Sequence, residues 1–280
     1  MAHENLFRAA GVIGWPVAHS RSPRLHGYWL ARHGIAGAYL PLPVRPDRIE
    51  AALRGLAALG FAGANVTVPH KQAALALADH PDALARRIGA VNLIVVREDG
   101  SLEGRNTDAA GFLDSLRAGC PSWRAADGPA VVLGAGGAAR AVVAALSDAG
   151  VPAICLLNRT RAHAETLAAS LGGPVAVLDW GRWAAALDGA ALLVNTTVLG
   201  MAGQAPLAID LAALPRAAVV CDIVYVPLET PLLAAARARG NPVVDGLGML
   251  LHQAVPAFKA WFGVRPEVTA EVRALIAATL

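Results

Sequence analysis

The chain has 280 residues, of which 55% are hydrophobic and 16% are charged. This composition excludes a disordered protein, and the length is sufficient for two domains. Lysine and arginine together number 24 against 21 for aspartate and glutamate, without a basic run, so nucleic acid is a poor candidate partner. A small anionic ligand needs only a few local positive groups and is compatible with this balance.

Three widely spaced cysteines, Cys120, Cys155 and Cys221, form no CxxC pair, which is typical of a reduced cytoplasmic protein. We expect no signal peptide, because the first residues lack a basic region followed by an apolar core. The uncharged run between Asp188 and Asp210 contains polar residues, and we interpret it as a buried strand and a polar loop, not a membrane span. The sequence does not distinguish a monomer from a homodimer.

Short β-like runs alternate with amphipathic stretches along the chain, which predicts an α/β fold with mainly parallel sheets. Because proline is favoured in a first helical turn, helices are expected to begin at three proline sites. The expected helix starts are Ser22-Pro23, Pro46-Asp47 and Pro69, and the expected strands before residue 106 are 10–13, 38–44, 62–66, 93–97 and 101–105. Asp99-Gly100 between the last two strands indicates a hairpin, and a helix is expected to begin near Thr107.

The segment 119–129, GCPSWRAADGP, is rich in turn-forming residues, and we interpret it as the connection between two domains. After it the alternation of strands and helices starts again. Strands are expected at 130–133, 153–157, 175–178, 191–194 and 219–222, and helices at 137–149 and 160–171. The final stretch, 248–280, has a helical pattern in which Pro256 is expected to kink or break the first helix.

A glycine-rich turn, VVLGAGGAAR at 131–140, follows the first of these strands. Gly134, Gly136 and Ala139 fit the G-x-G-x-x-A pattern of dinucleotide-binding folds. The first glycine permits a tight turn, the second lets the backbone approach a pyrophosphate at a helix N-terminus, and the alanine allows close helix–strand packing. We therefore predict that the cofactor phosphates contact Gly134, Ala135, Gly136, Gly137 and Ala138.

The strand after the glycine-rich turn ends in Asn158-Arg159-Thr160. An NAD-binding fold usually has an acidic residue here, which binds the ribose 2′-hydroxyl. A guanidinium at Arg159 would pair with a 2′-phosphate, whereas a carboxylate would repel it, so NADP is favoured over NAD. The alternative is that Arg159 is an ordinary solvated arginine at the end of a strand.

Four polar clusters lie at expected strand ends or helix starts, at 19–23, 65–71, 89–92 and 104–108. In open α/β sheets ligands bind beyond the carboxyl ends of the strands. These clusters supply hydroxyls, amides, one amine and one carboxylate, which suit a polyhydroxylated ring. The alternation in the second cluster directs Asn65 and Thr67 to the same face, so that both can bind one ligand.

With these motifs, the chain resembles the shikimate dehydrogenase family along nearly its whole length. The matching stretches are GWPVAHSRSPRLH (14–26), NVTVPHK (65–71), GAVN (89–92), GRNTDAAGF (104–112), LGAGGAARA (133–141), NRT (158–160), NTTVLGM (195–201), CDIVYVPLETPLL (221–233) and DGLGMLLHQAVPAF (245–258). The resemblance implies a substrate domain with a mainly parallel sheet at 1–111, a Rossmann-type NADP-binding domain at 112–245, and C-terminal helices at 246–280 that pack on the substrate domain.

The resemblance also implies an activity, the reversible reduction of 3-dehydroshikimate to shikimate with NADPH in aromatic amino acid biosynthesis. Lys71 and Asp108 resemble the catalytic pair of the family, and an ammonium group is suited to stabilising the negative charge that develops on a reduced ketone. The residues that resemble substrate ligands are Ser20, Ser22, Asn65, Thr67, Asn92, Tyr225 and Gln253. On the cofactor side the resemblance adds Met201, Gly246 and Met249.

Two other functions are considered, a quinate or dual-substrate dehydrogenase of the same family and a non-catalytic NADP-binding sensor. The Ser-x-Ser form of residues 20–22 resembles shikimate enzymes, whereas quinate-using relatives more often have Ser-x-Thr. A sensor would not need Lys71 and Asp108. By position alone these two residues could also be an ordinary helix-start lysine and aspartate.

Three histidines, His19, His26 and His33, are spaced seven residues apart, which raises the question of a metal site. Ser22-Pro23 interrupts any single helix through all three, and the surrounding residues are largely apolar. We therefore expect packing or capping roles and no metal site.

Overall fold

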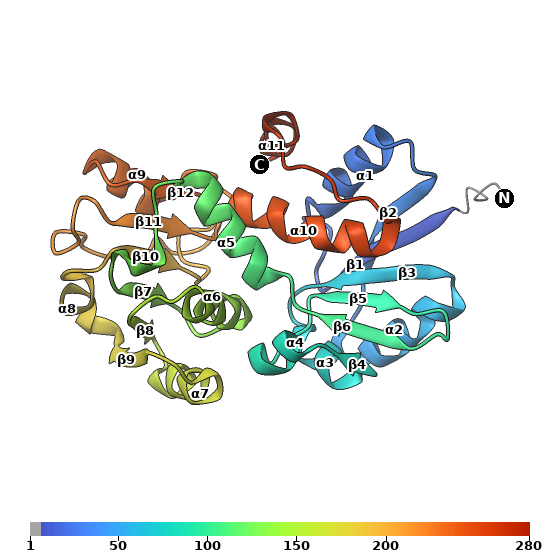
Figure 1. The fold of residues 1–280 in the computed structure, drawn as a ribbon, viewed down its shortest axis with the longest axis horizontal. Helices are drawn as coiled ribbons and strands as arrows, with labels where there is room; N and C mark the ends of the chain where they lie inside the picture. The colour runs from blue at the N-terminus through green and yellow to red at the C-terminus, as the bar shows by residue number, and fades with distance from the viewer. Residues whose placement is uncertain (1–6) are drawn as a thin grey trace. The chain divides into compact units, whose positions relative to one another are not determined.

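A computed structural model describes residues 7–280. The chain divides into two compact units. Unit 1 contains the residues up to 107 together with 253–279, and unit 2 contains 108–252 with Leu280. Each unit contains one six-stranded sheet (Figure 1). The expected α/β fold with mainly parallel sheets is therefore confirmed.

The sheet of unit 1 has the strand order β2-β1-β3-β5-β6-β4. Strand β1 pairs in parallel with β2 and β3, while β5 pairs antiparallel with both β3 and β6. The strands are β1 (Arg8–Gly14), β2 (Gly37–Pro43), β3 (Phe61–Val66), β4 (His80–Pro81), β5 (Leu93–Val96) and β6 (Leu102–Arg105). The expected hairpin is thus confirmed as β5–β6, and the carboxyl ends of β3 and β6 lie beside the start of β5.

Helices of unit 1 cover this sheet and bury a core that includes Leu53, Val66 and Ile94. They are α1 (Ser22–Arg32), η1 (Pro46–Arg48), α2 (Ile49–Ala58), α3 (Lys71–Leu77), α4 (Ala83–Ile88) and α11 (Ala270–Ala277). Helix α1 begins at the predicted serine, but the helix expected at Pro46 opens with a 3-10 turn. The short elements β4 and α4 were not predicted.

The helix expected to begin at Pro69 begins two residues later, at Lys71. Pro69 instead lies in a turn that is closed by a 2.9 Å hydrogen bond from the His70 N–H to the Thr67 carbonyl. The rule that proline favours the first helical turn fails here because the residues after β3 first form this tight turn. The turn places Lys71 at the first position of α3.

Helix α10 (Gly246–Phe262) continues through Pro256, so the break considered for this position does not occur. The buried side chains of Ala254 and Phe258 lie on either side of the proline. Further along, the Trp261 indole donates a 3.0 Å hydrogen bond to the carbonyl of Ile94 on β5. Packing of this helix outweighs the hydrogen bond that proline removes.

The sheet of unit 2 is entirely parallel, with the order β12-β11-β10-β7-β8-β9. Numbered from β7, this is the 3-2-1-4-5-6 order of a doubly wound dinucleotide-binding fold. The strands are β7 (Ala130–Leu133), β8 (Ile154–Asn158), β9 (Val175–Asp179), β10 (Leu192–Asn195), β11 (Val219–Asp222) and β12 (Val243–Val244). All four residues of β7 are buried, as expected for a strand covered on both faces.

The helices of unit 2 are α5 (Asp108–Gly119), η2 (Ala125–Asp127), α6 (Gly137–Asp148), α7 (Arg161–Leu171), η3 (Trp180–Arg182), α8 (Trp183–Leu187) and α9 (Pro231–Ala238). The segment 119–129 lies within this unit and does not connect the two units. Its Cys120 and Trp123 are buried, and Gly119 packs against Val244. The turn-forming residues of this segment indicated a connection between two domains. The division between the two units falls instead at the start of α5.

In the described part of the chain, 7–280, no helix has the length and apolar character that crossing a membrane requires.

Candidate active site

Asn92 is the centre of a hydrogen-bonded array in unit 1, at the point where β5 begins and β3 and β6 end. Its side-chain nitrogen donates to the Thr107 hydroxyl at 3.0 Å, and its side-chain oxygen accepts from the Thr107 N–H at 2.8 Å. The Asn65 side chain donates to the Asn92 carbonyl at 3.1 Å. All three residues are buried. The structure thus brings two of the predicted substrate ligands together where the ends of β3 and β6 meet the start of β5.

Tyr39 on β2 joins this array from the other side. Its hydroxyl donates a 2.7 Å hydrogen bond to the side-chain oxygen of Asn65 and also forms a hydrogen bond with the Ser22 side chain. Burial raises the pKa of Tyr39 well above 10, an effect that the hydrogen bond from Ser22 partly opposes. The hydroxyl therefore keeps its proton. The sequence analysis did not identify Tyr39, although a tyrosine in a buried strand needs a partner for its hydroxyl.

The two predicted serines lie where the chain enters α1. Ser22 is buried and is the first residue of the helix, and its N–H is within 3.3 Å of the Ser20 hydroxyl oxygen. The Ser20 N–H in turn donates to the Val17 carbonyl at 3.0 Å. The residue before the helix, Arg21, forms no side-chain cap. The entry to α1 therefore offers hydroxyl and backbone donors, the groups that a carboxylate requires.

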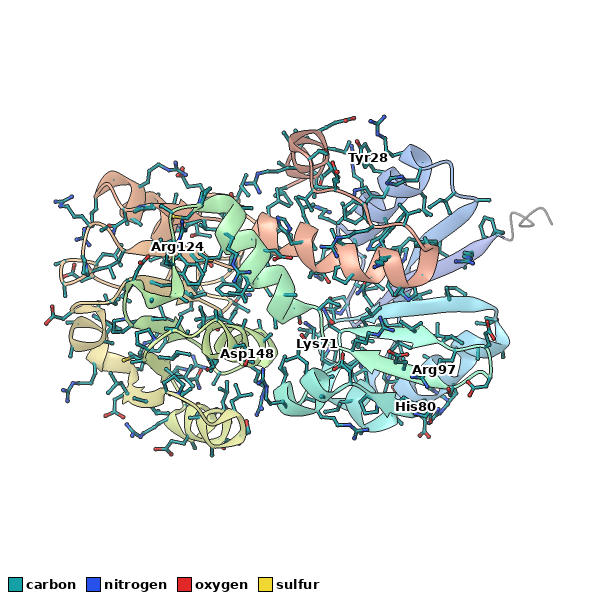
Figure 2. All side chains as sticks on the ribbon, viewed as in Figure 1. Tyr28, Lys71, His80, Arg97, Arg124 and Asp148 are labelled. Atoms are coloured by element: carbon teal, nitrogen blue, oxygen red, sulfur yellow. The ribbon has the colours of Figure 1, made fainter. Side chains whose placement is uncertain are left out.

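Lys71 is held by its backbone beside Asn92. Its carbonyl accepts a 2.9 Å hydrogen bond from the N–H of Val91, the residue before Asn92. On its other side the buried His70 ring donates from Nε2 to the Val44 carbonyl at 2.8 Å, which anchors the turn before α3. Lys71 is half-buried at the start of this helix (Figure 2). Thr67 precedes the turn and its N–H donates to the Ile13 carbonyl at 2.9 Å.

Asp108 is the first residue of α5 and is buried. It directly follows Thr107, whose N–H and hydroxyl both interact with Asn92. The array around Asn92 therefore fixes the chain immediately before Asp108. Lys71 is part of unit 1 and Asp108 opens unit 2. Gln253, the last predicted ligand of unit 1, is half-buried on α10.

His26 is fully buried in an aromatic cluster of unit 1, which accounts for one of the three evenly spaced histidines. Its ring stacks on Tyr39 with a centroid distance of 4.0 Å and an interplanar angle of 3°, and it meets Trp29 edge-on. Neither ring nitrogen has a hydrogen-bond partner among residues 7–280. Burial lowers the pKa of His26 to about 3, so the ring is neutral and acts as a packing group.

In unit 2 the glycine-rich turn has the geometry that the motif predicts. Gly134 has φ +108°, and a Cβ there would lie 2.6 Å from the Thr196 hydroxyl. Gly136 precedes α6 as its N-cap without a side-chain cap, and a Cβ built at Gly136 or Gly137 would point into space that the described residues beyond its own turn leave open. Ala139 is fully buried against the sheet. The turn therefore leaves exposed backbone and open space at a helix N-terminus, which suits a pyrophosphate.

The end of β8 presents one arginine without a partner in the described chain. Arg159 is exposed, and no ion pair holds it. Arg161 differs, because it pairs with Glu165 and Asp179, each at 2.7 Å. The Asn158 side chain donates to the Thr160 carbonyl at 2.8 Å and shapes the turn. Arg159 is thus the guanidinium at this strand end that is available to an anion.

A buried carboxylate organises the two loops that follow β10 and β11. Asp222 accepts hydrogen bonds from the side chains of Asn195 and Thr230 at 2.9 and 2.7 Å. Burial raises the pKa of Asp222, while these hydrogen bonds act in the opposite direction. The loops also meet directly, because the Ala202 N–H donates to the Val226 carbonyl at 2.8 Å. These backbone groups directly follow Met201 and Tyr225, so two predicted site residues lie on linked loops.

Gly246 and Met249 lie in the first turns of α10. A Cβ at Gly246 would lie 2.2 Å from the carbonyl oxygen of Ile223, so close packing requires glycine here. Met249 is half-buried, and Met201 is 36% exposed. The structure therefore gives Gly246 a packing role beside the loop of Tyr225, and its role in cofactor binding stays a prediction.

Comparisons with known proteins identify the family. Family models match residues 12–94 as a shikimate dehydrogenase substrate binding domain, 122–199 as shikimate/quinate 5-dehydrogenase, and 246–276 as a shikimate 5′-dehydrogenase C-terminal domain. A relative from Paramagnetospirillum magneticum, named shikimate dehydrogenase (NADP(+)), is 68% identical over 269 residues, which cover 96% of this chain and 98% of the relative. The chain belongs to the shikimate dehydrogenase family.

Solved structures similar to this member of the shikimate dehydrogenase family include one named as a shikimate dehydrogenase and one named as a quinate dehydrogenase. The shikimate dehydrogenase of Thermus thermophilus, solved with NADP(H) and shikimate, is 37% identical with a TM-score of 0.88, covering 98% of this chain and 100% of that one. A quinate dehydrogenase from Corynebacterium glutamicum, solved with NAD, is 32% identical with a TM-score of 0.90 and the same coverage. The family expected from the motifs is confirmed.

Proposed function

We propose that this chain catalyses the reversible NADPH-dependent reduction of 3-dehydroshikimate to shikimate in the biosynthesis of aromatic amino acids. The observation that carries the proposal is the 68% identity, over 96% of the chain, to a relative named shikimate dehydrogenase (NADP(+)). The buried amides and hydroxyls around Asn92 support it, because a hydroxylated ring needs such partners when it leaves water.

We assign the substrate contacts to residues at the start of α1, to residues near the ends of the unit 1 strands, and to Tyr225 and Gln253. Ser20 and Ser22, at the start of α1, would bind the carboxylate through hydroxyl and backbone donors. Asn65, Thr67 and Asn92 would bind ring hydroxyls. Tyr225 and Gln253 complete the proposed set. Buried polar groups of this kind give strong discrimination, since a ligand that lacks a hydroxyl leaves its partner unsatisfied.

Lys71 and Asp108 are the proposed catalytic residues. When a ketone is reduced, negative charge develops on its oxygen and a proton must follow. The Lys71 ammonium would stabilise this charge and stand as proton donor, while the Asp108 carboxylate would accept a hydrogen bond from a ring hydroxyl. The hydrogen bond from the Val91 N–H to the Lys71 carbonyl fixes the backbone of Lys71. The hydrogen bond from the Thr107 N–H to Asn92 fixes the backbone just before Asp108.

The residues of unit 2 suit NADP. The open backbone at Gly136 and Gly137 would hold the pyrophosphate, and the exposed Arg159 would pair with the 2′-phosphate. Bound NADPH would supply the hydride. We further propose that residues 1–111 bind the substrate, that 112–245 bind NADP, and that 246–280 return to the substrate domain.

A quinate or dual-substrate dehydrogenase is the second candidate, and the quinate dehydrogenase with a TM-score of 0.90 favours it. Two features of the chain favour shikimate and NADP instead. The residues at 20–22 have the Ser-x-Ser form, and the end of β8 has Arg159 where an NAD-specific fold has an acidic residue.

Steady-state kinetics with shikimate and quinate, each with NADP and with NAD, test the proposal. We expect the highest kcat/KM for shikimate with NADP. A higher kcat/KM for quinate with NAD would establish the second candidate, and absence of turnover with all four pairs would overturn both.

A cytoplasmic location and a monomeric or homodimeric state complete the proposal. The three free cysteines, of which Cys120 and Cys221 are buried, support a reducing compartment. Sedimentation of the purified protein would distinguish the two oligomeric states.

A further inference from the structure

Tyr39 combines a fixed ring with a hydroxyl that reaches two proposed substrate ligands. It lies on β2 opposite Ala10 of β1, and its side chain is buried. The ring stacks on His26 at 4.0 Å and packs near Trp261, with a centroid distance of 5.9 Å. The stacked His26 ring and the tilted Trp261 ring leave the Tyr39 ring little freedom to rotate. The hydroxyl position is therefore set by the aromatic cluster.

The direction of the hydrogen bond between Tyr39 and Asn65 is unambiguous. The acceptor is Oδ1 of Asn65, which carries no hydrogen, so the Tyr39 hydroxyl donates across 2.7 Å. At the other end of the same amide, Nδ2 donates to the Asn92 carbonyl at 3.1 Å. A donor on one side and a carbonyl on the other permit only one orientation of the amide.

We infer that Tyr39 is a positioning residue that orients the Asn65 amide toward the ring hydroxyls of the substrate. This inference rests on the proposed function. With the amide fixed, the second hydrogen on Nδ2 and the second lone pair on Oδ1 remain for a ligand. Without the Tyr39 hydroxyl, the buried Oδ1 loses its donor and a single hydrogen bond holds the amide.

Ser22 adds a link between this bond and the carboxylate end of the proposed substrate. Because the single hydroxyl hydrogen of Tyr39 goes to Asn65, the Ser22 hydroxyl is the donor in its hydrogen bond with Tyr39. A ligand carboxylate that takes the Ser22 hydrogen leaves the bond from Tyr39 to Asn65 in place. Tyr39 can therefore orient Asn65 whether Ser22 donates its hydrogen to Tyr39 or to the substrate carboxylate.

The test separates the hydroxyl from the ring. Tyr39→Phe keeps the ring that stacks on His26 and removes the hydroxyl, which is the donor to Asn65 and the acceptor from Ser22. Tyr28→Phe is the matched control, because Tyr28 on α1 is half-buried and its hydroxyl bonds to Glu271 of α11, outside the proposed site (Figure 2). KM for shikimate, KM for NADP, kcat and the thermal midpoint are measured for both variants.

We expect Tyr39→Phe to raise KM for shikimate about ten-fold, the loss that one net hydrogen bond represents, with KM for NADP unchanged. The same substitution made in an Asn65→Ala background should change KM for shikimate by no more than about two-fold, because its target is gone. Tyr28→Phe should leave both KM values at the wild-type level.

A purely structural role would give a different pattern. An unchanged KM for shikimate in Tyr39→Phe, or equal effects with and without the Asn65 side chain, would overturn the inference. A wild-type protein inactive on shikimate would overturn the proposed function and this inference together, whereas an active wild type with an unaffected Tyr39→Phe variant would overturn this inference alone.

Discussion

The side-chain amide of Asn195 donates a 2.9 Å hydrogen bond to the carboxylate of Asp222, and both side chains are fully buried at the ends of neighbouring parallel strands. The side-chain oxygen of the same amide accepts a hydrogen bond from the Thr197 N–H at 3.0 Å, and Asp222 accepts from the Val224 N–H at 3.0 Å. One buried pair therefore fixes the start of both loops after β10 and β11. The predicted site residues Met201 and Tyr225 depend on these loops for their positions.

Asp222→Ala should destabilise the protein by about 3 kcal/mol, because it leaves three buried donors without an acceptor. Urea unfolding measures this loss. Asp210→Ala is the control, since Asp210 is exposed and accepts a hydrogen bond from the Ala212 N–H, so its loss should cost about 1 kcal/mol or less. Equal effects of the two substitutions would show that the pair with Asn195 does not stabilise the loops.

Lys71→Met and Asp108→Asn should each lower kcat for shikimate oxidation by at least about 100-fold, because they remove the proposed charge stabilisation and proton transfer. NADPH affinity, measured by fluorescence titration, should stay within about two-fold, since neither residue belongs to the proposed cofactor contacts. Lys259, the only other lysine in the sequence, is exposed on α10, and Lys259→Met should leave kcat unchanged. Near-normal kcat in either catalytic variant would show that the assignment is wrong.

Arg159→Ala should raise KM for NADP by about 10-fold or more and leave KM for NAD nearly unchanged, because only NADP carries the 2′-phosphate. Arg161→Ala is a matched control two residues away, since its guanidinium already pairs with Glu165 and Asp179. It should alter both KM values equally. A loss of NADP preference in Arg161→Ala instead of Arg159→Ala would reverse the assignment.

His26→Phe should make the protein less sensitive to acid. The pKa of His26 falls from 6.5 to about 3 on burial, so its contribution to stability is complete above pH 6.5 and is lost as the pH falls toward 3. Between pH 7.5 and 5.0 this one group accounts for about 2 kcal/mol of lost unfolding free energy, which the phenylalanine variant should retain. Urea unfolding at the two pH values measures the difference, and equal losses in the two proteins would contradict the expectation.

The strand–turn–helix from β7 to α6 was predictable to within one residue, because a buried hydrophobic run, a glycine turn and an alanine-rich helix all favour the same local structure. The start of α3 was not, since a local rule for Pro69 cannot anticipate a turn that His70 anchors to the distant Val44. Short elements such as β4 carry too few residues to produce a periodic pattern.

In the candidate site, too, residues within local motifs were predictable from the sequence, whereas contacts between residues far apart in the sequence were not. Asn65 and Asn92 were identified from motifs that lie in continuous stretches of sequence. The hydrogen bonds from Tyr39 to Asn65 and from Asn92 to Thr107 were not predicted, because they join residues 26 and 15 positions apart. Only the pairing of β2, β1 and β3 brings Tyr39 beside Asn65, and sequence periodicity does not specify which strands become neighbours.

The route of the chain through α10 affects how the protein is made on the ribosome. Apart from Leu280, unit 2 is continuous in sequence, whereas unit 1 is completed by residues 253–279. The Trp261 side chain bonds to Ile94, and its carbonyl accepts a 3.0 Å hydrogen bond from Arg8 near the other end of the chain. The residues of unit 1 before 108 therefore cannot finish their packing until residues 253–279 have emerged, so residues 108–252 of unit 2 can complete their packing first.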